Sequence, residues 1–335
     1  MDIATICNDN GRVVRLSEAA IPYTKESIVT CNERMRSRLE LLGRIAPTDL
    51  RVLITGEPGT NKQDYAEHIH RLSKRAPQPY IRFDCAAVPE SRYEERLFGS
   101  DGEQRVSRGV VEAAAEGTLL LDGLTMVPEA FYDKLERLLE RSAIVRRGSR
   151  KQVAVNTRIL ATCSEDMVTI LRRDQRLAQL LQLASEVRIE VLPLRSRVED
   201  IALLALYYLE DANGRYGTNK RMGSALFREI LAYTWPGNER ELKNFIEQMV
   251  LSAPGEVLDD PGLIRNTARL TATLVPAWRR GSVVAEEKSL KEQVSEYELM
   301  IIRQSISRHG SLRKAAKALK VDPSVLSRKL AAAKE

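Results

Sequence analysis

Short apolar runs alternate with helical patterns over residues 26–194 of the chain. Runs rich in leucine and β-branched residues predict strands at 52–54, 80–83, 119–121, 158–161 and 187–191. Apolar positions three or four residues apart predict helices at 37–45, 62–73, 129–141 and 173–183. Because strands of this composition, separated by helices, are typical of parallel sheets, we expect an α/β fold.

The pattern becomes purely helical after residue 194. Predicted helices at 198–213, 225–232 and 239–251 indicate a smaller helical domain, and a stretch rich in Pro, Gly and charge follows them. We therefore divide the chain into a lead, an α/β core, a helical domain, a linker and a C-terminal all-α domain, at 1–25, 26–194, 195–253, 254–288 and 289–335. The lead contains the turn Asp9-Asn10-Gly11 and is either one hairpin or the remnant of a larger sensor domain.

Composition places the chain among globular proteins. Of its 335 residues, 43% are hydrophobic and 29% are charged. No apolar stretch approaches the roughly 20 residues that span a bilayer, and no secretory signal begins the chain, so we expect a cytoplasmic protein with no membrane partner. The four cysteines form no CxxC pair and lie near none of the three histidines, which predicts neither disulfides nor a metal site.

The basic excess is concentrated at the C-terminus. The formal net charge is +6, and the segment 288–335 alone holds eleven Lys and Arg against five Asp and Glu. A local excess of this kind suits the phosphate backbone of nucleic acids.

A glycine-rich turn follows the first predicted strand and precedes a helix. Backbone amides of such a turn, together with the helix N-terminus, can hold phosphates, and a lysine reaches the outer ones. The full pattern has Gly where Asn61 stands. The candidate nucleotide-binding residues in this turn are Gly56, Glu57, Pro58, Gly59, Thr60, Asn61, Lys62 and Gln63.

Several stretches in the same order and spacing resemble the AAA+ domain of sigma-54 dependent transcription activators over roughly residues 28–251. They read ITGEPGTNK, FDCAAVPES, ERLFG, GTLLLDG, LPLRSRVEDI and WPGNERELKN. The resemblance implies a P-loop AAA+ core with a helical lid. It also implies that Lys62 contacts phosphates, that Asp122 holds magnesium through water, and that Arg240 senses nucleotide from the lid.

Four positions depart from the family pattern. The carboxylate that would orient the attacking water after Asp122 is replaced by Gly123, and the sensor asparagine falls at about Ser164. Arg176 is the one candidate arginine finger in its segment, and it is out of register. The stretch SDGEQRVSRGVVE after LFG is shortened and lacks the GAFTGA loop that contacts sigma-54 in the family.

These departures predict a pseudo-ATPase with no catalytic residues and no required cofactor. ATP or ADP can still bind without turnover, because Lys62, Asp122 and Arg240 persist. An unfilled or repurposed pocket is the alternative.

The C-terminal segment predicts a helix-turn-helix. Gly310 ends one helix, Ser311 can cap a second over 312–319, and Asp322 with Pro323 opens a third that runs to 330. This segment resembles the Fis-type and TyrR-type motif found at the same place in the family. We expect base contacts from Ser324, Ser327 and Arg328, and phosphate contacts from Arg313, Lys314, Lys317 and Lys329. A basic three-helix cap without a DNA role is the alternative.

The preferred hypothesis is a sequence-specific DNA-binding transcription regulator that acts independently of sigma-54. Its expected partners are double-stranded DNA and further copies of the chain, as a dimer or a multiple of dimers, with an AAA+ ring as a further arrangement. RNA polymerase is a candidate partner, whereas sigma-54 is not expected. A conventional ATP-dependent sigma-54 activator and an AAA+ scaffold anchored to DNA are the two alternatives.

Overall fold

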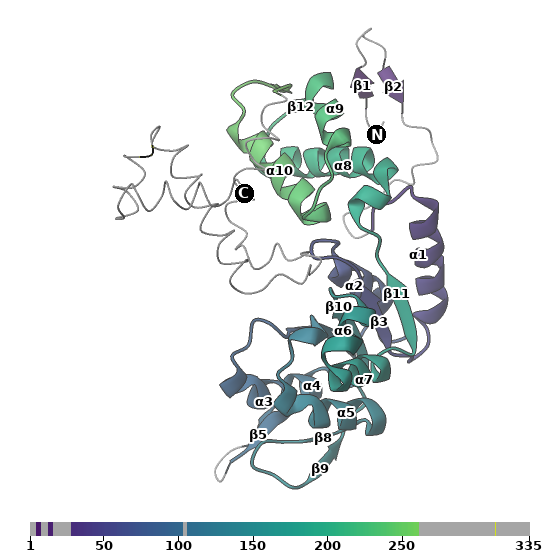
Figure 1. Ribbon diagram of the computed structural model, residues 1–335, viewed down its shortest axis with the longest axis vertical. Coiled ribbons are helices and arrows are strands. Elements are labelled where there is room, and N and C mark those ends of the chain that lie inside the picture. Colours follow the sequence, from purple (N-terminus) through teal and green to yellow (C-terminus); the bar gives the residue numbers. More distant parts are fainter. Residues whose placement is uncertain (1–4, 8–12, 16–27, 103–105, 261–311, 313–335) are drawn as a thin grey trace. The chain divides into compact units, whose positions relative to one another are not determined.

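Figure 1 shows the computed structural model of the chain, which describes residues 5–7, 13–15, 28–102, 106–260 and 312. The chain divides into two units, 1–267 and 268–335, and nearly all described residues belong to the first. The predicted linker beyond residue 260 and the predicted DNA-contacting side chains lie outside the described residues.

A five-stranded parallel sheet forms the centre of the core (Figure 1). In spatial order its strands are β11 (Val187–Glu190), β3 (Val52–Thr55), β10 (Arg158–Cys163), β7 (Thr118–Asp122) and β4 (Tyr80–Asp84). All four neighbouring pairs are parallel, which confirms the predicted α/β class. Because β10 lies between β3 and β7, it separates the P-loop strand from the strand that carries Asp122.

Helices cover both faces of this sheet. Along β3, Val52 and Ile54 pack into one cluster with α1 and α2, whereas Leu53 packs into the cluster of the opposite face. This alternation is the period of two expected for a strand that is buried on both sides. The helices of the core are α1 (Glu33–Ile45), α2 (Lys62–Arg71), α3 (Glu90–Phe98), α4 (Val110–Ala113), α5 (Tyr132–Arg141), α6 (Met167–Arg173) and α7 (Gln175–Leu183). Short 3₁₀ turns are η1 (Leu124–Met126), η2 (Glu129–Phe131) and η3 (Leu194–Ser196).

The helix predicted at 173–183 is confirmed by α7, which begins two residues later, but the pattern did not predict the separate helix α6 that ends at Arg173. Asp174 has an extended backbone, with φ −146° and ψ 100°, and so ends α6. Its carboxylate accepts a hydrogen bond from the Leu177 amide at 2.9 Å and thereby caps α7. The apolar periodicity continues across this break, which is why the pattern alone did not reveal it.

The lid consists of α8 (Val198–Tyr216), α9 (Ser224–Ala232) and α10 (Asn238–Ser252), packed around the buried Trp235. The expectation of a purely helical lid is wrong, since β12 (Arg221–Met222) pairs in parallel with β13 (Val257–Leu258). Leu258 is buried, and Asp259 accepts a hydrogen bond from the Ala225 amide at 2.9 Å, at the start of α9. The lid therefore extends past the predicted boundary at 253.

Three two-stranded antiparallel hairpins complete the described structure. The first joins β1 (Thr5–Cys7) to β2 (Val13–Arg15), as one of the two readings of the lead expected. The second joins β5 (Gly99–Asp101) to β6 (Val106–Arg108), and the third joins β8 (Ala143–Val145) to β9 (Gln152–Ala154). No helix within the described part of the chain is long and apolar enough to cross a membrane.

Asp200 ties the segment that precedes α1 to the first lid helix. Its side chain is fully buried and accepts hydrogen bonds from the Thr30 hydroxyl at 2.7 Å, the Cys31 amide at 2.6 Å and the Asn32 amide at 3.0 Å. Arg197 lies 3.5 Å from the same carboxylate and is also fully buried. A buried charge remains charged only when its partners replace the lost water, and Asp200 has four of them.

Asp200→Ala is expected to destabilise the protein by about 3–5 kcal/mol, because it takes the carboxylate away from three hydrogen-bond donors and removes one of the two carboxylates beside the buried Arg197. Urea unfolding of the full chain, followed by circular dichroism, measures this loss. Asp49→Ala is the matched control: its 73% exposed carboxylate pairs with Arg75 at 2.8 Å, and such surface pairs contribute about 0–1 kcal/mol. Equal losses in the two variants would contradict the role assigned to Asp200.

Candidate nucleotide-binding site

The P-loop connects β3 to α2, as the sequence predicts, and two glycines give it its shape. Gly56 has φ +153° and Gly59 has φ +82°, and a Cβ at either position would collide with backbone oxygen. At Gly56 the Cβ would lie 2.6 Å from the Val191 oxygen, and at Gly59 it would lie 2.1 Å from the Gly237 oxygen. Only glycine therefore permits the close approach of this loop to β11 and to the lid.

Asn61 preserves the loop although the usual pattern has Gly there. Its backbone is left-handed, with φ 54° and ψ 40°, a conformation that Asn tolerates better than most residues. Its side-chain amide donates to Glu239 of the lid at 3.1 Å. The substitution therefore keeps the turn and adds a contact between the P-loop and the lid.

Three further contacts hold the P-loop against the lid and its entry segment. Glu57 forms a two-pronged ion pair with Arg195, one prong at 2.7 Å, and this guanidinium keeps the pKa of Glu57 below its usual range. The side-chain amide of Asn238 donates to the backbone oxygen of Pro58 at 3.0 Å. The backbone amide of Arg240 donates to the Gly59 oxygen at 3.1 Å. The family resemblance predicted Arg240 as a nucleotide-sensing residue of the lid, but it did not predict this backbone contact with the P-loop.

Glu239 is the buried centre of this junction. Arg197 donates to one of its carboxylate oxygens, and the Tyr208 hydroxyl donates to the other at 3.3 Å. Burial raises the pKa of Glu239, and the charge of Arg197 opposes that rise. Sequence reasoning missed Glu239 as a site residue. The sequence did contain a signal for it, because the charged Glu239 lies between Asn238 and Arg240 in the motif stretch GNEREL.

Lys62 begins α2 and is 6% exposed. Its amine donates to the backbone oxygens of Gly56 and Glu57, both at 2.9 Å. Burial lowers the pKa of Lys62 to about 8, and the nearby carboxylate of Asp122 opposes this fall. The lysine thus lies inside the loop that it would serve, within the electrostatic reach of Asp122.

Asp122 ends β7, and both of its oxygens have partners. One accepts from the Thr162 hydroxyl at 2.6 Å, and the other accepts from Arg82 Nε at 2.8 Å and Arg82 Nη2 at 2.6 Å. Gly123 follows with φ 78° and ψ 52°, and its amide donates to the Thr162 hydroxyl at 2.8 Å. Arg82 was not expected at the site, because in the strand pattern it occupies an ordinary exposed position.

Arg176 is engaged within its own chain. It pairs with Asp133 and, at 3.4 Å, with Glu129, and its guanidinium carbon lies 5.8 Å from the centre of the Tyr132 ring. These partners hold the arginine finger candidate against α5 and η2 of the same subunit. A role in trans would require all of these contacts to break.

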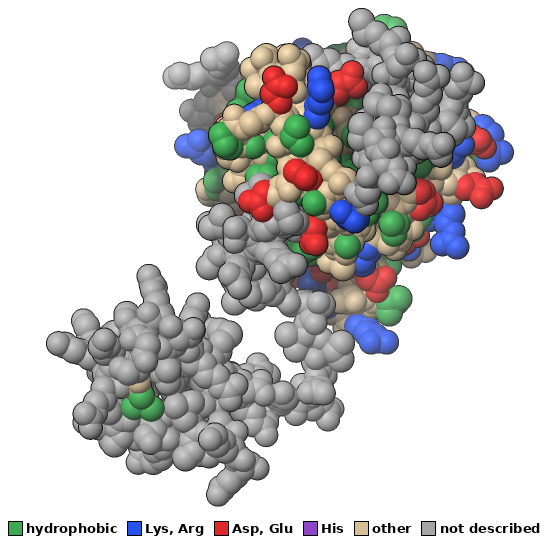
Figure 2. Space-filling model, turned by 90° about the horizontal axis from the view of Figure 1, so that it is seen from above, with side chains coloured by type: hydrophobic (Ala, Val, Ile, Leu, Met, Phe, Trp, Pro, Cys, Tyr) green, Lys and Arg blue, Asp and Glu red, His purple; other side chains and the backbone are tan. Residues whose placement is uncertain are grey.

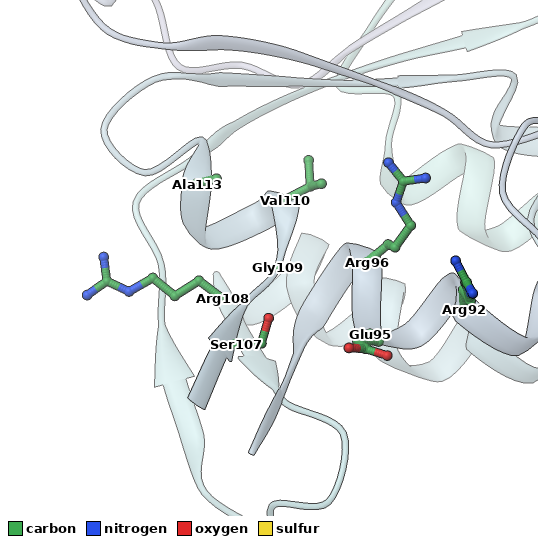
Figure 3. Close-up of a pocket in the computed structure, with 8 residues that line it drawn as sticks. All are labelled: Arg92, Glu95, Arg96, Ser107, Arg108, Gly109, Val110 and Ala113. Carbon is green, nitrogen blue, oxygen red and sulfur yellow. The ribbon is translucent and has the colours of Figure 1, made fainter. Parts of the chain in front are cut away.

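The segment that lacks the GAFTGA loop forms the short hairpin β5–β6. Beside it lies a pocket of 620 Å³ (Figure 3), lined by Arg92, Glu95, Arg96, Ser107, Arg108, Gly109, Val110 and Ala113. Figure 3 shows that Arg108 points away from Arg92 and Arg96. The three guanidinium groups therefore do not converge on one ligand position, and we assign no ligand to this pocket.

Cys85 is 2% exposed, and burial raises its pKa to about 12, so its thiol is a packing group. His70 is also buried, and its Nδ1 lies 2.9 Å from the Thr118 hydroxyl. Within the part of the chain that the structure describes, no group of three or more His, Cys, Asp or Glu side chains is arranged to hold a metal ion.

Two family models cover the described core and lid. The sigma-54 interaction domain matches residues 28–190, and the AAA+ ATPase lid domain matches residues 195–272. The regulatory protein AtoC of Escherichia coli (strain K12) is 32% identical, over 90% of this chain and 67% of AtoC. The chain belongs to the family of sigma-54-dependent transcriptional regulators.

Two further similar proteins extend the comparison. The transcriptional regulatory protein FlbD of Caulobacter vibrioides (strain ATCC 19089 / CIP 103742 / CB 15) is 33% identical over 72% of this chain. The matched region spans about half (54%) of the length of FlbD. NtrX from Brucella abortus, solved in complex with ADP, is similar with a TM-score of 0.64 and 27% identity, over 92% of this chain and 69% of that one. These matches confirm the P-loop AAA+ fold.

Lys62 gives the site a pH-dependent signature. Between pH 8 and its ordinary pKa of 10.5, the folded state releases this proton while the unfolded state keeps it. The unfolded state then binds more protons, so the free energy of unfolding should rise with pH across this window. Relative to Lys62→Met, the wild-type protein should gain about 1–3 kcal/mol there, as measured by urea unfolding at several pH values.

Lys220→Met is the matched control, because the Lys220 amine also donates to two backbone oxygens, those of Ala253 at 2.6 Å and Gly255 at 2.5 Å. This control shows how much stability is lost with two such hydrogen bonds alone, apart from the pH-dependent contribution of Lys62. A difference between wild type and Lys62→Met that stays constant from pH 7 to 10.5 would contradict the assignment.

Proposed function

We propose that this protein is a sequence-specific DNA-binding transcription regulator whose AAA+ domain does not hydrolyse ATP and which acts without sigma-54. The observation that carries the proposal is Gly123, in a left-handed conformation at the position after Asp122. Hydrolysis needs a group that orients the attacking water, and this position supplies none.

Two further observations support the loss of hydrolysis. Arg176 is paired with acidic residues of its own subunit, and the shortened hairpin β5–β6 replaces the loop that the family uses to engage sigma-54. In the family, the water-orienting carboxylate, the trans arginine and the sigma-54 loop all serve ATP hydrolysis that acts on sigma-54. Because all three differ here, we infer that this chain does not couple ATP hydrolysis to sigma-54.

Nucleotide binding without turnover remains part of the proposal. Gly56, Glu57, Pro58, Gly59, Thr60, Asn61, Lys62 and Gln63 form the turn at the end of β3, and Asp122 and Arg240 face the same loop from β7 and α10. NtrX has been solved with ADP and with ATP, so a related fold accepts such ligands.

DNA binding is assigned to the C-terminal segment. Its six excess positive charges equal the formal charge of the whole chain, so residues 1–287 are neutral in sum. On the face shown in Figure 2, Lys and Arg side chains are interspersed with Asp and Glu, without a single-sign field among the described residues. The proposed contacts are made by Arg313, Lys314, Lys317, Ser324, Ser327, Arg328 and Lys329.

The second candidate is a conventional ATP-driven sigma-54 activator. It is favoured by the match to the sigma-54 interaction domain and by the retention of Lys62, Asp122 and Arg240. The measurement of hydrolysis separates the two candidates directly.

The purified protein is expected to release phosphate from ATP no faster than a buffer blank. Gly123→Glu should not restore activity by itself, because Arg176 would remain engaged in its own subunit and a side chain at φ +78° is strained. A coupled phosphate-release assay with Mg²⁺ measures both proteins. Turnover of about 1 per second or more that disappears in Lys62→Ala would contradict the proposal and favour the second candidate.

Arg328→Ala should weaken binding to the cognate DNA site by about 1–3 kcal/mol, if Arg328 makes a bidentate base contact, and should leave random DNA nearly unaffected. Lys329→Ala is the matched control and should weaken both DNAs alike, because a phosphate contact carries no sequence information. Fluorescence anisotropy at fixed salt measures the affinities of the wild type and of both variants for the two DNAs. Equal losses on cognate and random DNA for Arg328→Ala would reassign this residue to the phosphate backbone.

A further inference from the structure

Arg82 pairs with Asp122, the carboxylate to which the family resemblance assigns magnesium. Its guanidinium directs Nε and Nη2 to a single oxygen of Asp122, at 2.8 and 2.6 Å, and the Thr162 hydroxyl takes the other oxygen at 2.6 Å. The Asp122 side chain is only 17% exposed, whereas that of Arg82 is 46% exposed. The carboxylate is therefore covered, and the guanidinium is open to solvent.

The residues present do not fit Mg²⁺ at this carboxylate. Mg²⁺ requires a near-ideal octahedron and keeps several of its waters, and those waters need acceptors such as the Asp at the end of this strand. Both oxygens of Asp122 already accept hydrogen bonds, one of them from a cation. A dication would also be repelled by the positive charge of the guanidinium.

Arg82 can itself supply positive charge to a phosphate. A guanidinium has five N–H donors in a planar fork that matches phosphate geometry, and Asp122 engages only Nε and Nη2. Arg82 also shares its surroundings with the P-loop. Its charge acts on Asp64 of α2, while Asp122 and Arg240 both act on Lys62. Arg82 is thus linked to the P-loop lysine through Asp122, the carboxylate with which it pairs.

We propose that the P-loop binds a nucleoside di- or triphosphate without a divalent cation, and that Arg82 provides the charge that Mg²⁺ provides in hydrolysing relatives. The inference rests on the proposed non-hydrolysing function and deepens it, since no bond is made or broken. Arg82 is a specificity-determining residue for the metal-free ligand. Its pairing with Asp122 also occupies one of the two carboxylate oxygens to which the waters of Mg²⁺ would donate.

Calorimetric titration of the full chain with ADP, once with EDTA and once with excess Mg²⁺, tests the proposal. The wild-type protein should bind ADP with the same Kd in both buffers. Arg82→Ala should lose about tenfold in affinity with EDTA, the value of one charge-assisted hydrogen bond, and should recover it with Mg²⁺ because Asp122 is freed. Arg215→Ala is the matched control, since Arg215 pairs with Asp211 and Glu247 on the lid surface and should leave both Kd values unchanged.

Wild-type binding that requires Mg²⁺ would overturn the inference, and so would the absence of ADP binding in both buffers. A requirement for Mg²⁺ would leave the proposed function standing, whereas the absence of ADP binding would also remove nucleotide binding from it. The absence of hydrolysis and the binding of DNA are tested separately, by phosphate release and by the DNA affinities. An Arg82→Ala protein that binds as the wild type does in both buffers would also overturn the role of Arg82.

Discussion

The buried carboxylate of Glu239 joins the P-loop to the lid, and the arrangement of the site depends on this junction. It accepts from Asn61 in the loop and from Arg197 and Tyr208 in the lid. A carboxylate removed from water is costly unless charge and hydrogen bonds replace the solvent, and here three donors do so. Arg197 in turn lies beside Asp200, which holds the segment before α1. One connected network therefore spans the loop, the lid and the entry to the core.

This network explains how the fold persists where the usual motif is altered. Asn61 adopts the left-handed conformation that the missing glycine would have taken, and its side chain finds an acceptor in the lid. Gly123 leaves the end of β7 without the second carboxylate but keeps a hydrogen bond to Thr162. The scaffold of the family is retained while the groups for chemistry differ, which illustrates that a fold alone does not determine activity.

Much of the fold could be predicted because each buried strand is a compact apolar run, and all five strands occur within about two residues of their predicted positions. The break at Asp174 and the two-residue strands β12 and β13 could not, since the first interrupts a continuous apolar period and the others are too short to show one. The P-loop residues were found by motif. Arg82 was missed because its partner Asp122 lies on a different strand, and only the parallel pairing of β4 with β7 brings them together.

The central claim, regulation of transcription through DNA binding without ATP hydrolysis or sigma-54, is tested most directly in the native host. Genome-wide occupancy and transcript levels should be compared between the wild type, the deletion strain and a Lys62→Ala strain, each with and without sigma-54. The account predicts that the wild type and Lys62→Ala occupy the same sites and produce the same transcript changes in both backgrounds. Transcript changes that vanish in Lys62→Ala, or that require sigma-54, would contradict it.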